Sequence, residues 1–168
     1  MNNGCMIFLC FWVLINPPQI AIWLEDTQGN YLSTVYVTHK IATQSWQASG
    51  GNRRKEALPH WCYSRGVKYD DGLYLPTKKE PLIDGISGAT PHESFNIKLN
   101  PATALKKFVV KIEINHSTDF NEAFPKSAKD GEANYSGGKE GSGQPAIVYA
   151  ANVDLSSGEK SFEANLMG

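Results

Sequence analysis

Short apolar segments separated by turn-forming residues run along most of the chain and are typical of β-strands. The segment Gln19 to Asp26 is apolar on both alternating faces, so we expect a strand that is buried on both sides. The residues Thr27 to Asn30 then supply a turn, in which Gly and Asn tolerate a positive φ. A second strand, Tyr31 to Thr38, is rich in β-branched and aromatic residues. Together the two segments predict a β-hairpin.

The segment Phe108 to His116 has the cleanest alternation of apolar and polar residues in the chain. Its apolar side chains share one face of a strand: Phe108, Val110, Ile112 and Ile114. Its polar side chains share the opposite face: Lys111, Glu113 and Asn115. This pattern predicts a strand of an antiparallel sheet, with one face on the core and the other in water.

Three further segments have the composition of strands: Ser94 to Leu99, Ala146 to Leu155 and Lys160 to Leu166. The last two are joined by a turn at Ser156 to Gly158. A helical periodicity sustained over about ten residues is not found. We therefore predict an all-β fold, an immunoglobulin-like antiparallel β-sandwich with a long loop excursion.

The excursion spans His39 to Pro91, where the regular alternation is lost. A single helical turn is expected between Lys55 and Trp61, close to Pro59. Long irregular connections are uncommon in compact domains and are often functional. Aromatic residues supply the apolar anchors that would pack this one down: Trp46, Trp61, Tyr63, Tyr69 and Tyr74. We expect the part from Trp46 to Pro91 to be the contact surface for a partner or ligand.

Composition and charge narrow the classes of function. The 168 residues match a single domain, and 16 Lys and Arg against 17 Asp and Glu leave a net charge of -1. Nucleic-acid binding would need a local basic patch, and the best candidate, Arg53 to Lys55, is followed directly by Glu56. A solvated loop explains that triplet better, so we expect no nucleic-acid partner. The cysteines have neither the pairing of a disulfide framework nor zinc-site spacing: Cys5, Cys10 and Cys62.

Residues 1–16 contain an uninterrupted apolar run from Cys5 to Ile15. A run of this length is too short to cross a bilayer as a helix, but it matches the apolar part of an export signal. No Lys or Arg precedes it. We interpret residues 1–16 as a degenerate export signal, with an extra β-strand as the alternative, and residues 17–168 as a single β-sandwich domain.

Several sequence blocks follow one another in a fixed order: Gln19 to Tyr31, Ala57 to Trp61, Gly72 to Pro76, Asp84 to Pro91, Lys107 to Asn115 and Gly141 to Tyr149. Together they resemble the predicted periplasmic proteins of domain-of-unknown-function family 2271. The resemblance covers roughly Gln19 to Gly168 and implies export to the periplasm and an immunoglobulin-like sandwich, but no established activity. Such proteins continue with a His-Gly segment where this chain ends, which implies a C-terminal truncation.

The motif Asp84 to Thr90 matches the core of the pattern that flavin transferases recognise, Asp-x-x-Ser/Thr-Gly-Ala-Thr. In that chemistry the hydroxyl of the last Thr is esterified to the phosphate of FMN. Ser87 stands at the Ser/Thr position, and Gly88 and Ala89 would let an extended peptide enter the transferase. Thr90 would supply the acceptor oxygen. This motif therefore predicts a covalent FMN site.

One feature weighs against that interpretation of the motif. Pro91 and His92 follow it, where the fuller pattern prefers a second Ser or Thr. A structural turn that closes the excursion back onto a strand is the alternative interpretation. In the FMN hypothesis Asp84 would orient the peptide or help to hold a metal-bound phosphate.

The sequence thus supports two functions. The first is an exported, non-enzymatic domain that binds a protein or a small ligand in the periplasm or at the cell envelope. The alternative is a covalent FMN carrier, modified on Thr90, in extracytoplasmic electron transfer, with a flavin transferase or a membrane redox protein as its partner. A catalytic triad, a nucleophile elbow and metal-ligand spacing are not found, so an enzyme is the weakest hypothesis.

Overall fold

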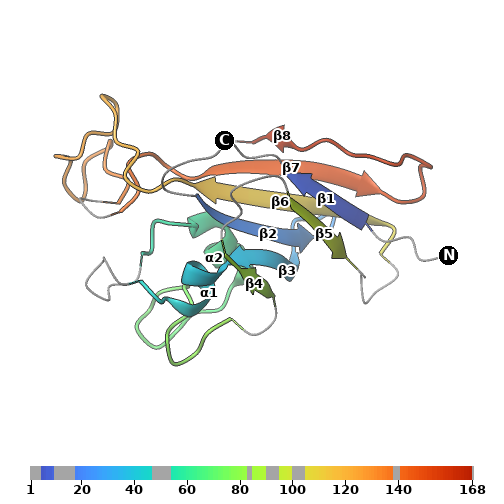
Figure 1. Cartoon of the computed structure of the whole chain (residues 1–168), viewed down its shortest axis with the longest axis horizontal. Helices are drawn as coiled ribbons and strands as arrows, with labels where there is room; N and C mark the ends of the chain where they lie inside the picture. The colour runs from blue at the N-terminus through green and yellow to red at the C-terminus, as the bar shows by residue number, and fades with distance from the viewer. Residues whose placement is uncertain are drawn as a thin grey trace.

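The structure is a computed structural model that describes residues 5–9, 18–46, 54–82, 85–89, 95–99, 105–137 and 141–167. Most regular structure in these residues is β-strand, arranged around one six-stranded sheet (Figure 1). In spatial order its strands are β4 (Ile86–Gly88), β3 (Tyr31–Thr38), β2 (Gln19–Glu25), β6 (Lys107–Asn115), β7 (Ile147–Asp154) and β8 (Asn165–Leu166). The pair β3 and β4 is parallel and the other pairs are antiparallel, so the sheet is mixed. The protein is therefore predominantly β.

The predicted hairpin of β2 and β3 is confirmed. The two strands pair antiparallel, with Ala21 opposite Val37, and every residue of β2 is buried. In the turn, the carboxylate of Asp26 accepts the backbone N–H of Gln28 at 2.8 Å and that of Asn30 at 2.9 Å. The side-chain amide of Asn30 also donates to this carboxylate, at 2.7 Å. This bond first, and then the backbone bonds, lower the pKa of Asp26. Together they form a local Asx-type turn that fixes the register of the hairpin.

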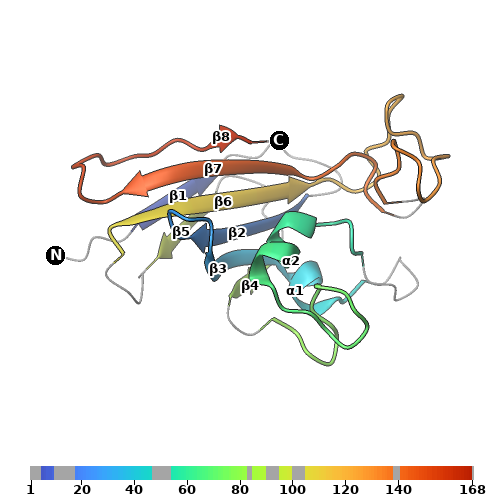
Figure 2. The same ribbon diagram turned by 180° about the vertical axis from the view of Figure 1, so that it is seen from behind.

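Both faces of the six-stranded sheet are covered. On one face, Ile97 of β5 (Phe95–Leu99) joins an apolar cluster with residues of β2, β3, β6 and β7. Strand β5 pairs antiparallel with β1 (Cys5–Leu9) in a separate two-stranded sheet. On the other face, the helices α1 (His39–Thr43) and α2 (Pro59–Arg65) and the loop at Leu75 form a second cluster (Figure 2). The large sheet is thus the middle of three layers.

The prediction that one face of β6 lies in water is wrong. Its apolar face packs as predicted, but on the opposite face Glu113 is 0% exposed and Asn115 is 2% exposed. The start of α2 covers Glu113, whereas Asn115 is bonded to Ser142 and Gln144, which follow β6 in the chain. Alternation of polar and apolar residues shows that the two faces of a strand differ, but it does not predict whether another segment covers the polar face.

Two other predicted elements differ from those observed. A strand was expected over Lys160 to Leu166, but only β8 is paired, opposite Tyr149 and Ala150. The residues 159–161 are exposed, so this part of the segment has no buried face that would hold it against β7. The excursion, in contrast, holds more regular structure than expected: α1, the seven-residue α2 and β4.

The N-terminal residues that the structure describes form strand β1, in register with β5 from Cys5 opposite Leu99 to Leu9 opposite Phe95. The export signal assigned to residues 1–16 stays a prediction, because pairing in one conformation does not report processing of the chain. Among the helices of the described residues, none is long and apolar enough to cross a membrane.

Candidate functional site

A cavity of about 400 Å³ lies between helix α2, the segment 72–75 and the loops at 130–137 and 145–146. Small-molecule sites in proteins typically occupy about 300–1,000 Å³, so the cavity has the size of a ligand site. Three tyrosines contribute its aromatic lining: Tyr63, Tyr74 and Tyr135. Four ionisable side chains contribute its polar lining: Lys55, Glu56, His60 and Asp130. Part of the predicted contact segment thus lines a cavity together with residues between 130 and 146, and its role as a contact surface stays a prediction.

Helix α2, which forms one wall, is capped by a residue from the sheet. Its first helical residue is Pro59, which lacks an N–H and suits this position. The next two backbone N–H groups have no partner within a helix, and both donate to the Glu113 carboxylate, His60 at 3.0 Å and Trp61 at 2.8 Å. Burial raises the pKa of Glu113 to about 7, against the lowering effect of these two hydrogen bonds. Strand β6 thus fixes the start of α2.

The side of α2 that faces the sheet is anchored by Trp61. This side chain is 0% exposed, and its indole N–H donates to the Thr34 hydroxyl at 3.0 Å. The helix ends at Gly66, whose φ of 69° is the left-handed conformation that glycine adopts at little cost. Trp61 is an anchor, as predicted, and it is therefore not available to touch a partner. Tyr63, two residues on, is 65% exposed.

Tyr63 pairs with Tyr74 at the cavity. Their ring centroids are 4.7 Å apart and their planes are inclined by 44°. The turn before Tyr74 is fixed by Gly72, which has a φ of 80° and donates its N–H to the Tyr69 carbonyl at 2.8 Å. The Asp71 carboxylate accepts the N–H of Leu73 at 3.0 Å. A partly exposed aromatic pair is thus held by two ordered elements.

Glu56 is a less exposed residue of the cavity lining than Tyr63, and only glycine fits at two positions beside its side chain. A Cβ atom added to Gly137 would lie 3.1 Å from Cδ of Glu56, and one added to Gly141 would overlap its Oε1. Burial raises the pKa of Glu56, and Arg54 and Lys55 lower it. The sequence predicts a flexible loop over Ser136 to Gly143. In the described part of this loop, Gly137 and Gly141 leave space for the Glu56 carboxylate. The positions of the glycines in the sequence do not predict this contact.

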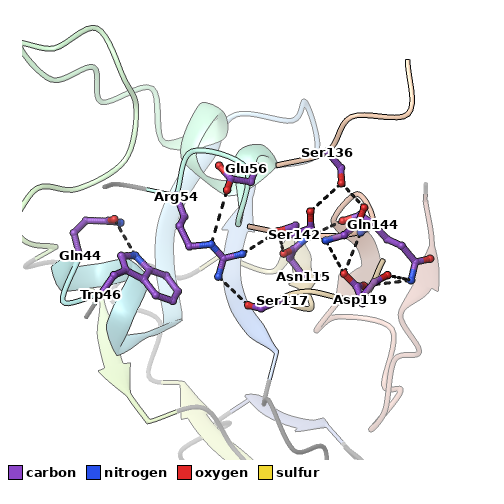
Figure 3. Close-up of polar contacts among 11 residues, drawn as sticks. Gln44, Trp46, Arg54, Glu56, Asn115, Ser117, Asp119, Ser136, Ser142 and Gln144 are labelled. Atoms are coloured by element: carbon purple, nitrogen blue, oxygen red, sulfur yellow. Dashed lines mark hydrogen bonds and ion pairs between the residues drawn. The ribbon is translucent and has the colours of Figure 1, made fainter. Parts of the chain in front are cut away.

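Arg54 stands behind the cavity in a polar network (Figure 3). Its side chain is 6% exposed and donates to the hydroxyls of Ser117 at 2.8 Å and Ser142 at 3.2 Å. Its guanidinium lies 4.8 Å from the ring centroid of Trp46, within cation–π range. The interpretation of Arg53 to Lys55 as a solvated loop is therefore wrong for Arg54. Burial lowers the pKa of Arg54, and the nearby Glu56 and Asp119 oppose that effect.

The same network joins the beginning and the end of the connection between β6 and β7 (Figure 3). Asp119 accepts the backbone N–H groups of Gly143 at 2.8 Å and Gln144 at 3.0 Å. The Ser142 hydroxyl donates to the Asn115 side chain, and the Ser136 hydroxyl donates to the carbonyls of Ser142 and Gly143. These bonds hold Ser136, which lines the cavity, in a fixed position.

The residues of the FMN motif lie at the opposite edge of the sheet from β8. Strand β4 carries Ser87 and Gly88 and pairs parallel with β3, and the Tyr36 hydroxyl donates to the Ala89 carbonyl at 2.8 Å. Ser87 and Ala89 are exposed. Asp84 and Thr90 lie outside the described residues, so the structure does not test the motif as a whole, and the FMN site stays a prediction. The described residues of the motif, 85–89, do not line the cavity.

No group of three or more His, Cys, Asp or Glu side chains within the described ranges is placed to hold a metal ion. Comparisons with protein-family models, curated proteins and solved structures give no match. The resemblance to domain-of-unknown-function family 2271 therefore stays a prediction.

Proposed function

We propose that this protein is a binding domain rather than an enzyme, and that its ligand occupies the cavity beside α2. One observation supports this most strongly: the tyrosine pair Tyr63 and Tyr74 remains partly exposed at a cavity whose walls are fixed by buried contacts. Binding sites are commonly loops held by a rigid scaffold, because preorganisation lowers the entropy lost on association.

The place of action that we propose is the periplasm or another extracytoplasmic compartment. Its support is the apolar run of residues 1–16 and the resemblance to a predicted periplasmic family. The same resemblance favours an immunoglobulin-like sandwich as the finer description of the fold. The packing of Ile97 from the small sheet onto the large sheet is consistent with such an arrangement.

A fragment screen tests the binding function. In ligand-observed NMR, fragments that bind the wild type should lose about tenfold or more in affinity against Tyr74→Ala, because the aromatic wall is removed. Tyr69→Ala is the matched control, since Tyr69 belongs to the same excursion but does not line the cavity. Thermal melts should show that both variants are folded. Equal binding by Tyr74→Ala and wild type, or equal losses in the two variants, would contradict the proposal.

We infer a covalent FMN carrier as the second candidate function, because the segment Ile86–Gly88 is extended at a sheet edge with Ser87 exposed. A transferase needs this kind of access to its acceptor peptide. If the site is loaded, Thr90 would carry the flavin, which would supply electron-transfer chemistry, and Asp84 would orient the peptide.

Intact-mass measurement after co-expression with a flavin transferase tests this second candidate. The wild type should gain the mass of one FMN phosphoester, and Thr90→Ala should not. Thr43→Ala, at a threonine remote from the motif in the chain, should keep the adduct. An unmodified wild-type chain, or an adduct that persists in Thr90→Ala, would eliminate FMN attachment at this position.

A further inference from the structure

The cavity lining indicates a class of ligand, an inference that rests on the proposed binding function. The lining carries a Lys and two carboxylates, Lys55, Glu56 and Asp130. A strongly anionic ligand would meet the two carboxylates. A strongly cationic ligand would meet Lys55. Since like charges in partly desolvated sites repel, this mixed lining disfavours a ligand with a large charge of either sign.

Glu56 argues in addition against an entirely apolar ligand. Its side chain is 17% exposed, and Nε of Arg54 lies 3.9 Å from its Oε1, an ion pair too long for a hydrogen bond. The carboxylate also accepts its own backbone N–H. A carboxylate offers about four acceptor positions, so these contacts leave capacity for the donors of a ligand. An apolar ligand would displace water from these oxygens without donating a hydrogen bond in its place, and this desolvation costs free energy. A ligand with neutral O–H donors would satisfy them without adding charge.

The aromatic part of the lining requires a different property of the ligand. Tyr63 and Tyr74 contribute aromatic rings to it, and Leu73 and Pro145 contribute apolar atoms. Aromatic rings favour contact with a weakly polar C–H face. A ligand that suits both the polar and the aromatic lining therefore needs hydroxyl groups along its edges and an apolar face. Pyranose rings have this combination.

We propose that the cavity binds a neutral saccharide of one or two pyranose rings, with a sugar face on Tyr63 and Tyr74 and ring hydroxyls donating to Glu56. The volume of about 400 Å³ accommodates a ligand of this size. Lys55 and Asp130 at the same cavity supply a further donor and a further acceptor for hydroxyl groups. Gly137 and Gly141 leave the space that the Glu56 side chain occupies.

Chemical-shift titrations of the ¹⁵N-labelled full chain test this proposal. The probes are neutral sugars (methyl glucoside, maltose, cellobiose and N-acetylglucosamine), with glucuronate and glucosamine as the anionic and cationic arms. A neutral sugar should shift the amides of Tyr63, Tyr74 and Tyr135 in a saturable manner. Glu56→Gln, which keeps size but loses the second strong acceptor and its charge, should weaken binding by about tenfold. Glu159→Gln, at an exposed loop position, should bind as wild type does.

The outcomes separate this inference from the proposed function. Saturable binding of a neutral sugar that depends on both Glu56 and Tyr74 supports both. Binding of only glucuronate, only glucosamine or only apolar fragments at the same amides overturns the ligand class and leaves the binding function standing. If neutral sugars shift no cavity amide in tens of millimolar ligand, the saccharide proposal is wrong. Glu56→Ser serves as a second variant should Glu56→Gln fail to fold.

Discussion

Replacing Glu113 by Gln should abolish a pH dependence of stability that the wild-type protein shows between pH 4.5 and about 7. Burial raises the pKa of this carboxyl to about 7 in the folded chain, from an ordinary value of 4.5. The folded state therefore holds a proton that the unfolded state has released over this interval. The stabilisation is fully present below pH 4.5 and is lost as the pH rises through 7.

The pKa difference of about 2.5 units (7 − 4.5) corresponds to about 3.5 kcal/mol in all, at about 1.4 kcal/mol per unit, and about 2–3 kcal/mol of this falls between pH 5 and pH 8. Urea unfolding at pH 5 and pH 8 would measure it as a double difference between wild type and Glu113→Gln, in which the other titrating groups cancel. Gln retains one acceptor for the N–H groups at the start of α2. A double difference near zero, or a wild type that gains relative stability at pH 8, would contradict the buried position of this carboxyl.

Replacing Trp61 by Ala should cost about 3–5 kcal/mol of the free energy of unfolding. The side chain is fully buried between α2 and the sheet, so its removal leaves a cavity. It also removes the hydrogen bond to Thr34. For a domain whose total stability is about 5–15 kcal/mol, such a loss threatens the folded state. Denaturant unfolding followed by circular dichroism would measure it.

Tyr63→Ala is the matched control for Trp61→Ala, because it removes an aromatic residue from the same helix. Tyr63 is 65% exposed, so we expect a loss within about 1 kcal/mol. Trp61→Phe should fall between the two, since it keeps an aromatic ring but not the indole N–H. Equal costs for Trp61→Ala and Tyr63→Ala would contradict the orientation of α2 on the sheet.

The local parts of the fold could be predicted from the sequence. The hairpin of β2 and β3 depends on continuous burial and on a turn with its own hydrogen bonds, both of which are encoded within neighbouring residues. The apolar face of β6 follows from strict alternation. Helix α2 was expected only as a turn near Pro59. The start of α2 is capped by Glu113, which lies far along the chain.

The candidate site could be predicted only as a region. The aromatic residues of the excursion predict a contact segment, part of which lines the cavity. The sequence pattern does not distinguish the buried Trp61 from the exposed Tyr63. The second wall of the cavity comes from Asp130 to Gly137, where neither periodicity nor a motif signals a site. Arg54 and the glycines around Glu56 owe their roles to contacts between distant segments. Such contacts cannot be predicted from neighbouring residues in the sequence.

Chemical-shift mapping of bound ligand on the full chain tests the binding function most directly. Any ligand retained from the fragment and sugar titrations is added to ¹⁵N-labelled protein, and the largest amide shifts are assigned to residues. We expect them to cluster at His60, Tyr63, Leu73, Tyr74 and Tyr135, around the cavity beside α2. Shifts centred instead on the β4 edge from Ile86 to Ala89, with the cavity amides unmoved, would contradict this assignment of the binding site.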